Sequence, residues 1–215
     1  MTAQQGASDL HLSPGHYPTL RVDSRLVALT NKKILDREAL EGLVFTMLGE
    51  RKELFLVEKE LDFSYELEQK ARFRVNAYYT KGNIAAALRF IPDEIRTIEE
   101  LNLPQIIKVF TKLSQGFVLV VGPVGHGKST TLAAIIDLIN KERAEKIITI
   151  EDPIEYIFTP DKSVIDQREI YQDTFSFHKA LRSTFRQNVN VILVGEMMDY
   201  ETMSAAVTAA ETGHL

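Results

Sequence analysis

The stretch VLVVGPVGHGKSTTLAAIIDLI, residues 118–139, decides the fold of the second half of the chain. Its centre, Gly122 to Ser129, fits the pattern G-x-x-x-x-G-K-[ST] and lies between an apolar, strand-like run and a helical pattern. In this pattern the glycines let backbone N–H groups turn toward phosphate oxygens, and the following helix adds its positive N-terminal end. The motif therefore predicts a nucleoside triphosphate site on a strand, a loop and a helix.

Each polar residue of the motif has a chemical role. The Lys128 ammonium neutralises phosphate charge, and the Ser129 hydroxyl is a ligand for Mg²⁺. We therefore expect ATP and Mg²⁺ as the cofactors. The residues expected to contact the nucleotide are Gly122, Pro123, Val124, Gly125, His126, Gly127, Lys128, Ser129 and Thr130.

The second half of the chain alternates apolar runs with helical patterns. The apolar runs are FVLVV (117–121), KIITI (146–150) and NVILVG (190–195), and helical patterns cover 130–143, 175–187 and 199–211. Strands that are apolar throughout and separated by helices indicate a parallel sheet covered on both faces. The fold class predicted for this half is therefore α/β.

The residues before Pro92 have a different pattern, typical of a small α+β unit. Two short strands flank a turn at Asp23 and Ser24, and a helix follows with Asp36 as its N-cap. Turn-like segments, EQK (68–70) and TKGN (80–83), then separate three further strands. These strands are expected at residues 61–67, 71–79 and 84–91, and together they favour an antiparallel sheet.

The domain boundaries follow from this change of pattern. The segment PDEIRTIEELNLP is polar, has a proline at each end and lacks strand alternation. We therefore assign an N-terminal domain to residues 1–91, a linker to 92–104 and an ATPase domain to 105–215. Since the chain stops only about four strands into such a fold, we expect a truncated chain, with Gly213 ending its last helix.

Acidic residues follow two of the apolar runs. Glu155 lies in EDPIE, directly after KIITI, and Glu196 lies two residues after the strand NVILV. Open α/β sheets bind their ligands at the carboxyl ends of the strands. A carboxylate there can hold Mg²⁺ through water or orient an attacking water molecule. The sequence therefore predicts hydrolysis of the nucleotide, with Ser129 and Glu196 as the metal-binding residues.

Composition excludes several classes of protein. A net charge of −5 provides no general basic field for binding nucleic acid. With no cysteine, the chain forms neither disulfides nor thiolate metal sites. No run approaches the 18 apolar residues of a membrane span, and the first residues lack the pattern of a signal peptide. We expect a cytoplasmic protein that binds no nucleic acid.

Eight segments occur in this order: ASDLHLSPG, RFRVNAYY, GPVGHGKSTTLAA, TIEDPIEYI, VIDQREI, ALRSTFRQ, VILVGEMMDYET and AAETGHL. Together they resemble the motor ATPases of the secretion superfamily, above all the type IV pilus retraction, or twitching motility, ATPases. The resemblance implies a PAS-like N-terminal domain and a RecA-like ATPase domain. It also implies a cytoplasmic homo-hexamer that hydrolyses ATP to retract the pilus, and that reaches the inner membrane only through a pilus platform protein.

The resemblance further implies catalytic roles outside the phosphate loop. Glu155 matches the catalytic glutamate of an acidic box, Glu196 matches the Walker B glutamate, and His214 matches the first histidine of a histidine box. Arg74 and Arg89 lie in stretches that supply nucleotide-facing arginines in this family. An arginine outside the phosphate-binding domain reaches the γ-phosphate only after domain closure, which couples shape to nucleotide state. The alternative is that Arg72 and Arg74, which alternate with Phe73 and Val75, form the solvent-facing side of a half-buried strand.

The chain departs from the family pattern at a few positions. Val189 and Asn190 stand where proline and aspartate are usual, and Met198 replaces an arginine, which removes a permanent cation. Lys81 also replaces an arginine, and His126 replaces a small residue. We expect the His126 side chain to point away from the phosphates; the alternative is that its protonated ring adds pH-dependent phosphate affinity.

Three alternative functions remain open from the sequence. The first is an extension-type or type II secretion ATPase, although the forms QREI, DTFSF and TAAETGHL favour the retraction branch. The second is a non-hydrolysing accessory subunit, which Val189, Asn190 and Met198 favour. The third is a nucleic-acid motor, which has only the analogy of the RecA-like fold in its support. We expect the 215-residue chain itself to hydrolyse ATP slowly or not at all.

Overall fold

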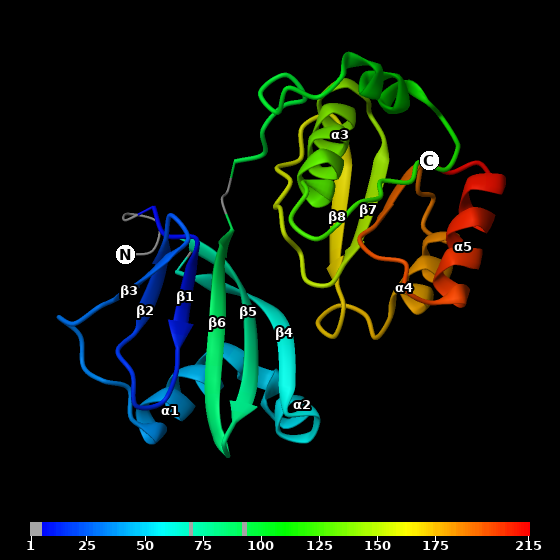
Figure 1. The fold of residues 1–215 in the computed structure, drawn as a ribbon. Coiled ribbons are helices and arrows are strands. Elements are labelled where there is room, and N and C mark those ends of the chain that lie inside the picture. Colours follow the sequence, from blue (N-terminus) through cyan, green and yellow to red (C-terminus); the bar gives the residue numbers. More distant parts are fainter. Residues whose placement is uncertain (1–5, 69–70, 92–93) are drawn as a thin grey trace. The chain divides into compact units, whose positions relative to one another are not determined.

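The computed structural model describes residues 6–68, 71–91 and 94–215, which form two compact units (Figure 1). Of the described residues, 6–68 and 71–91 belong to the first unit and 94–215 to the second. The first five residues of the expected N-terminal domain, two residues of the expected EQK turn and the first two residues of the expected linker lie outside the described residues.

The first unit is built on an antiparallel sheet with the strand order β3-β2-β1-β6-β5-β4. Asp23 and Ser24 join β2 to β3 with φ values of 47° and 66°, as a two-residue hairpin turn requires. The expected hairpin and the three later strands are therefore confirmed. The strands are β1 (Asp9–Leu12), β2 (Thr19–Val22), β3 (Arg25–Ala28), β4 (Glu60–Leu67), β5 (Ala71–Thr80) and β6 (Asn83–Ile91).

Two helices complete the core of the first unit. Helix α1 (Arg37–Leu48) begins after Asp36, whose carboxylate accepts the Ala39 N–H at 2.8 Å, so the expected N-cap is confirmed. A 3-10 turn η2 (Gly49–Arg51) leads into α2 (Lys52–Glu58), a helix that the charged sequence did not indicate. Side chains of both helices pack with the sheet in one hydrophobic cluster, which includes Leu40, Val44, Leu48, Phe55, Phe63 and Val75.

The second unit contains a parallel sheet with the strand order β8-β7-β9. The strand β8 was not expected, because its sequence VIDQRE ends in four consecutive polar residues instead of being apolar throughout. The expected strands at 146–150 and 190–195 and the expected helices at 130–143, 175–187 and 199–211 are present within a few residues of their predicted bounds. The elements are η3 (Gln105–Lys112), α3 (Lys128–Glu142), β7 (Lys146–Glu151), β8 (Val164–Glu169), α4 (Phe177–Thr184), β9 (Val191–Val194) and α5 (Tyr200–Glu211).

Two separate hydrophobic clusters cover the two faces of this sheet. Ile147 of β7 packs in a cluster with side chains of α3, whereas Ile148 and Ile150 pack in a cluster with side chains of α4 and α5. Successive residues of a strand point to opposite faces, so an apolar strand such as β7 serves both clusters. The predicted parallel sheet with both faces covered is confirmed.

The expected strand at residues 117–121 requires a correction. This run lies outside the sheet, and Phe117, Leu119 and Val121 are 47%, 56% and 76% exposed. A strand needs a hydrogen-bonded neighbour, and a cavity of about 530 Å³, lined by this run and by β9, separates the two. At the mouth of the cavity the Gly116 N–H donates to the His214 carbonyl at 3.0 Å.

The last residue of the chain also bonds to the β9 side of this cavity. The Leu215 N–H donates to the Asn190 carbonyl at 2.9 Å, and the Leu215 carbonyl accepts the Ile192 N–H at 2.7 Å. This is the pattern of a parallel pair of strands. The end of the chain therefore lies between β9 and Gly116, and an apolar run alone could not reveal that arrangement.

The described part of the expected linker packs with the second unit. Ile98 is buried, and Ile95 packs against the cluster that also contains α3. Thr97 and Glu100 bond reciprocally: the Thr97 N–H donates to the Glu100 carboxylate at 2.7 Å, and the Glu100 N–H donates to the Thr97 hydroxyl at 3.2 Å. Residues 94–104 thus form an ordered, capped turn, although their polar sequence indicated a linker.

Candidate nucleotide site

The phosphate loop has the backbone that its glycines predict. Gly125 and Gly127 have φ values of 77° and 80°, a region that residues with a β-carbon rarely adopt. Helix α3 begins at Lys128, and no side chain caps its N-terminus. The first N–H groups of α3 are therefore available to an anion, which the positive end of the helix also favours.

Lys128 is held by its own loop. Its Nζ donates a hydrogen bond to the Pro123 carbonyl at 3.0 Å, across the turn of the loop. A lysine ammonium has three donors, so this bond leaves others for phosphate oxygens. The position places a cation at the mouth of the loop, next to the uncapped helix end.

The residues present fit a nucleotide with a divalent cation. Among the described residues no group of three His, Cys, Asp or Glu side chains could hold a metal ion by itself. Mg²⁺ in nucleotide sites is commonly bound by substrate phosphates, water and one or two protein oxygens rather than by such a group. The Ser129 hydroxyl, exposed in the first turn of α3, is suited to that role.

The two predicted catalytic glutamates line one small cavity with Ser129. The lining of this cavity, of about 50 Å³, includes Glu151 at the end of β7, Glu155 after that strand, and Gly195 and Glu196 after β9. The Gly195 N–H donates to the Ile150 carbonyl at 2.8 Å, and a β-carbon on Gly195 would lie only 3.2 Å from the same oxygen. The glycine thus permits the close approach of β7 and β9 that brings Glu155 and Glu196 together.

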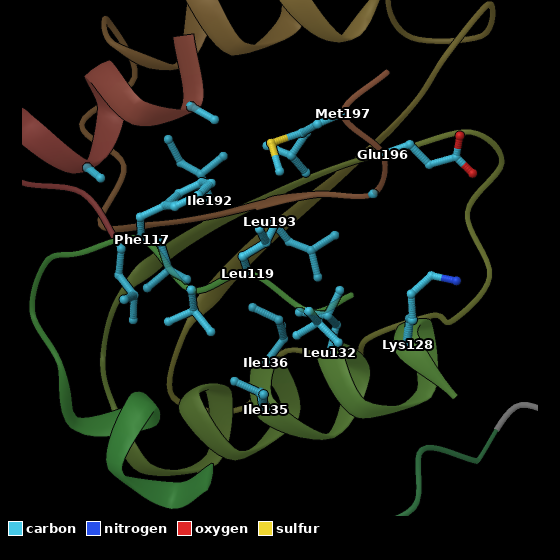
Figure 2. Close-up of a pocket in the computed structure, with 18 of the residues that line it drawn as sticks. Phe117, Leu119, Lys128, Leu132, Ile135, Ile136, Ile192, Leu193, Glu196 and Met197 are labelled. Carbon is cyan, nitrogen blue, oxygen red and sulfur yellow. The ribbon is translucent and has the colours of Figure 1, made fainter. Parts of the chain in front are cut away.

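The large cavity beside β9 meets the phosphate loop at one end. In Figure 2 the Lys128 amine and the Glu196 carboxylate lie at the same side of the view, apart from the apolar side chains. Leu119, Leu132 and Ile136 line the rest of this cavity. The cavity therefore has one polar, phosphate-facing end and an apolar body.

Glu151 is a site residue that the sequence prediction missed. Burial raises the pKa of its carboxyl, and hydrogen bonds from Thr149, the Glu155 backbone and Gln167 only partly offset this effect. The Thr149 hydroxyl donates to Glu151 at 2.6 Å, and the Glu155 N–H donates to it at 3.4 Å. Its position as the first acid of EDPIE was a usable signal, because it ends a buried strand.

The two histidines singled out in the sequence lie apart from the carboxylates of the small cavity. His126 is exposed, and its Nδ1 lies 3.0 Å from the carbonyl of Val124 in the same loop. His214 Nδ1 lies 3.0 Å from the carbonyl of Ala209 at the end of α5, and its ring contacts Phe185 edge to face at 5.7 Å. Neither contact reaches the carboxylates of the small cavity.

The three residues near β9 that depart from the family pattern lie in different surroundings. Met198 is 83% exposed, so it fills no apolar site. Val189 is buried with the α4 cluster. Asn190 joins β9 to β7: its side-chain oxygen accepts the Lys146 N–H at 2.9 Å, and its own N–H donates to the Lys146 carbonyl at 2.9 Å. Asn190 is thus a strand-pairing residue.

Arg74 and Arg89 belong to the first unit. They lie directly opposite each other on β5 and β6, and Asp9 of β1 lies opposite Arg89 on its other side. Arg89 Nε donates to the Asp9 carboxylate at 3.0 Å, and Arg74 Nε lies 3.8 Å from the Asp62 carboxylate. Two arginines side by side in a sheet repel each other, and these carboxylates reduce that repulsion.

Comparison with known proteins shows the family to which this chain belongs. The family model described as type II/IV secretion system protein matches residues 3–215. The chain belongs to this family. The type IV pilus retraction ATPase PilT of Pseudomonas aeruginosa is 45% identical over the whole chain, which covers 62% of that protein. The twitching motility protein of Neisseria gonorrhoeae is 44% identical over 92% of the chain, which covers 53% of that protein.

Solved structures of this secretion family agree with the fold. The crystal structure of the pilus retraction motor PilT with bound ADP has a TM-score of 0.94 and 43% identity, and the match covers all of this chain and 63% of that one. The ATPase DotB of Legionella pneumophila has a TM-score of 0.87 and 32% identity over 99% of this chain and 61% of that one. The second unit is thus a RecA-like ATPase domain that follows an N-terminal domain, and the resemblance to retraction ATPases is confirmed.

The chain spans about three fifths of the length of these two relatives of known structure. Among the helices that the structure describes, none has the length and apolar character needed to cross a membrane.

Proposed function

We propose that the full-length protein is a Mg²⁺-dependent ATPase that powers retraction of a type IV pilus. The observation that carries the proposal is the common cavity of Ser129, Glu155 and Glu196 beside an uncapped phosphate loop. The similarity to a retraction motor that binds ADP supports the same function. Nucleotide hydrolysis needs all three elements in one place: phosphate binding, a metal ligand and a carboxylate near the attacking water.

Each residue has a specific task in this proposal. Lys128 and the first N–H groups of α3 bind the phosphates, and Glu155 accepts a proton from the attacking water or orients it. Ser129 would hold Mg²⁺ directly and Glu196 would hold it through water; the ion would neutralise charge on the phosphates. Arg74 and Arg89 are proposed to reach nucleotide when domains close, and His214 is proposed as a catalytic residue because it matches the first histidine of the histidine box.

The proposed oligomeric state and cellular location follow from the resemblance to retraction ATPases. The full-length protein is proposed to act as a homo-hexamer at the cytoplasmic face of the inner membrane, where it transmits force to a pilus platform protein. We propose no direct contact with nucleic acid or lipid. The mixed charge of the chain and the proximity of acidic side chains to the phosphate loop support this proposal.

Replacement of Glu155 by glutamine in the full-length protein tests the proposal. We expect kcat for ATP hydrolysis to fall by about 100-fold or more, because general bases contribute at least that factor, while the Kd for ATP changes less than about twofold. Glu142→Gln, an exposed position at the end of α3, is the matched control and should retain wild-type kcat. Loss of ATP binding together with turnover would instead give Glu155 a structural role.

Met198 favours one second candidate, a non-hydrolysing accessory subunit. An exposed methionine stands close to Glu196, where an arginine is usual in the pattern of this family. Loss of a permanent cation beside a phosphate site weakens stabilisation of the transition-state charge. ATP turnover by the homogeneous full-length protein separates the candidates, because an accessory subunit would bind ATP and leave it intact.

A further inference from the structure

Strand β8 brings two polar side chains to the segment that contains Glu155. Gln167 and Glu169 are two residues apart, so they lie on the same face of the strand. Glu169 is 1% exposed, which is rare for an acid without a specific partner, and Gln167 is half-buried. Neither residue lines the nucleotide cavities, and neither has a role in the proposed binding of phosphate or metal.

Gln167 bonds to the backbone on the far side of Glu155. Its Nε2 donates to the Tyr156 carbonyl at 2.7 Å, and its Oε1 accepts the Phe158 N–H at 2.9 Å. One amide side chain thus satisfies one backbone acceptor and one backbone donor of an irregular segment. A segment without regular secondary structure depends on such bonds for a fixed backbone.

Glu169 and Glu151 bind the backbone just before Glu155 and at Glu155 itself. The Glu169 carboxylate accepts the Ile154 N–H at 3.1 Å, in a buried position. The Glu151 carboxylate accepts the N–H of Glu155 itself at 3.4 Å, and Gln167 Nε2 also lies 3.4 Å from Glu151. The backbone is therefore held by hydrogen bonds at Glu155 and on both sides of it. Gln167 makes the bonds after Glu155 and also contacts Glu151, which makes the bond at Glu155 itself.

The same segment is tied to the phosphate-binding helix. The Tyr156 hydroxyl lies 2.9 Å from the Thr130 hydroxyl of α3, one residue after Ser129. The carbonyl of Tyr156 is the one that Gln167 binds. A shift of Tyr156 would therefore alter both the direction of Glu155 and its distance from the phosphate loop.

We propose that Gln167 of β8 is a positioning residue for Glu155. It orients the catalytic carboxylate by fixing the backbone at Tyr156 and Phe158, while Glu169 fixes Ile154. The inference rests on the proposed function, since it requires that Glu155 acts on the attacking water. A displacement of about 1 Å in a positioned catalytic group can reduce the rate by about 100-fold.

The test is Gln167→Met in the full-length protein, which keeps the side-chain length and removes the hydrogen bonds to Tyr156, Phe158 and Glu151. We expect kcat for ATP hydrolysis to fall by about 10- to 100-fold with KM for ATP within about twofold of wild type. Amide hydrogen exchange should become faster at Phe158, and exchange within β7 should not change. Asp166→Asn is the matched control, because Asp166 lies on the same strand and pairs with Lys146, away from this segment.

The outcomes separate the two proposals. A wild-type protein without turnover would refute the proposed function. A wild-type protein with turnover and a Gln167→Met variant with the same kcat would refute the positioning role alone. A raised KM at unchanged kcat, or faster exchange throughout the second unit, would also refute it, because these results indicate nucleotide binding or general stability.

Discussion

At the scale of single residues, two glycines show how local geometry decides what a position tolerates. A β-carbon on Gly195 would meet the Ile150 carbonyl oxygen at 3.2 Å and the Glu151 Cα at 3.4 Å, which are both backbone atoms. Gly42 lies within α1, and a β-carbon there would meet no atom within 4 Å. The same substitution therefore has opposite consequences at these two positions.

We expect Gly195→Ala to lower the free energy of unfolding of the second unit by about 1–3 kcal/mol, because β7 and β9 must separate to admit the methyl group. The strand ends would move with it, so kcat for ATP hydrolysis should also fall. Gly42→Ala is the control, and it should raise the stability of the first unit by about 0.5–1 kcal/mol through helix propensity. Urea denaturation of both variants measures the effects, and a Gly195→Ala variant as stable as wild type would contradict the predicted crowding.

At the scale of elements, Asp9 joins three strands of the first unit. It lies opposite Arg21 of β2 and Arg89 of β6, with Nε–carboxylate distances of 3.8 Å and 3.0 Å. Burial tends to raise the pKa of Asp9, but hydrogen bonds from Ser8 and Arg89, together with the nearby positive charge of Arg89, outweigh it, so the pKa is lowered in the folded protein. The ionised carboxylate therefore stabilises the fold.

This lowered pKa predicts an acid-dependent stability. The contribution of Asp9 is fully present above its unfolded pKa of about 3.8 and is lost as pH falls through the lower folded pKa, since the unfolded state then binds the proton first. We expect Asp9→Asn to be less stable than wild type at pH 7 and to approach wild type near pH 2.5. Urea denaturation from pH 2.5 to 7 measures this. Glu58→Gln, exposed at the end of α2, should follow the wild-type curve.

At the scale of the whole molecule, each unit has its own hydrophobic core, but the second unit also has an open apolar cavity. The run 117–121 and the edge of β9 border about 530 Å³ of space, and Leu119 and Val121 are more than half exposed. Exposed apolar surface of this kind is uncommon on a monomeric domain and marks a binding or assembly surface. The hydrogen bonds of Leu215 and Gly116 at the mouth show that extended backbone fits between the two sides.

The 215-residue chain should therefore bind the apolar dye ANS in its native state. We expect the double substitution Leu119→Ser and Val121→Ser to reduce native-state ANS fluorescence several-fold, because these side chains form one wall of the cavity. Ile34→Ser removes an apolar side chain that is also more than half exposed, but from the first unit, and should leave the fluorescence unchanged. Equal fluorescence from the double variant and wild type would place the dye elsewhere.

Most elements of the fold could be predicted from the sequence because their signals are local. Asp36 predicts a helix start by its own hydrogen bond, Asp23 and Ser24 predict a hairpin by their backbone preference, and the apolar strand β7 predicts burial on two faces. The strand β8 was missed because it lacks an apolar run, and two of its polar residues, Gln167 and Glu169, bond to the segment 151–158.

For the site, the sequence by itself determined the phosphate loop, since glycine φ values, the lysine and the helix start all lie within one short stretch. It also placed Glu155 and Glu196 at strand ends. Only the tertiary structure decided that these acids share a cavity with Ser129, and that Gln167 holds the backbone beside Glu155. It also left residues 117–121 outside the sheet. The reason is that hydrogen bonds between strands and between distant side chains depend on which neighbours are present, and no local pattern encodes that.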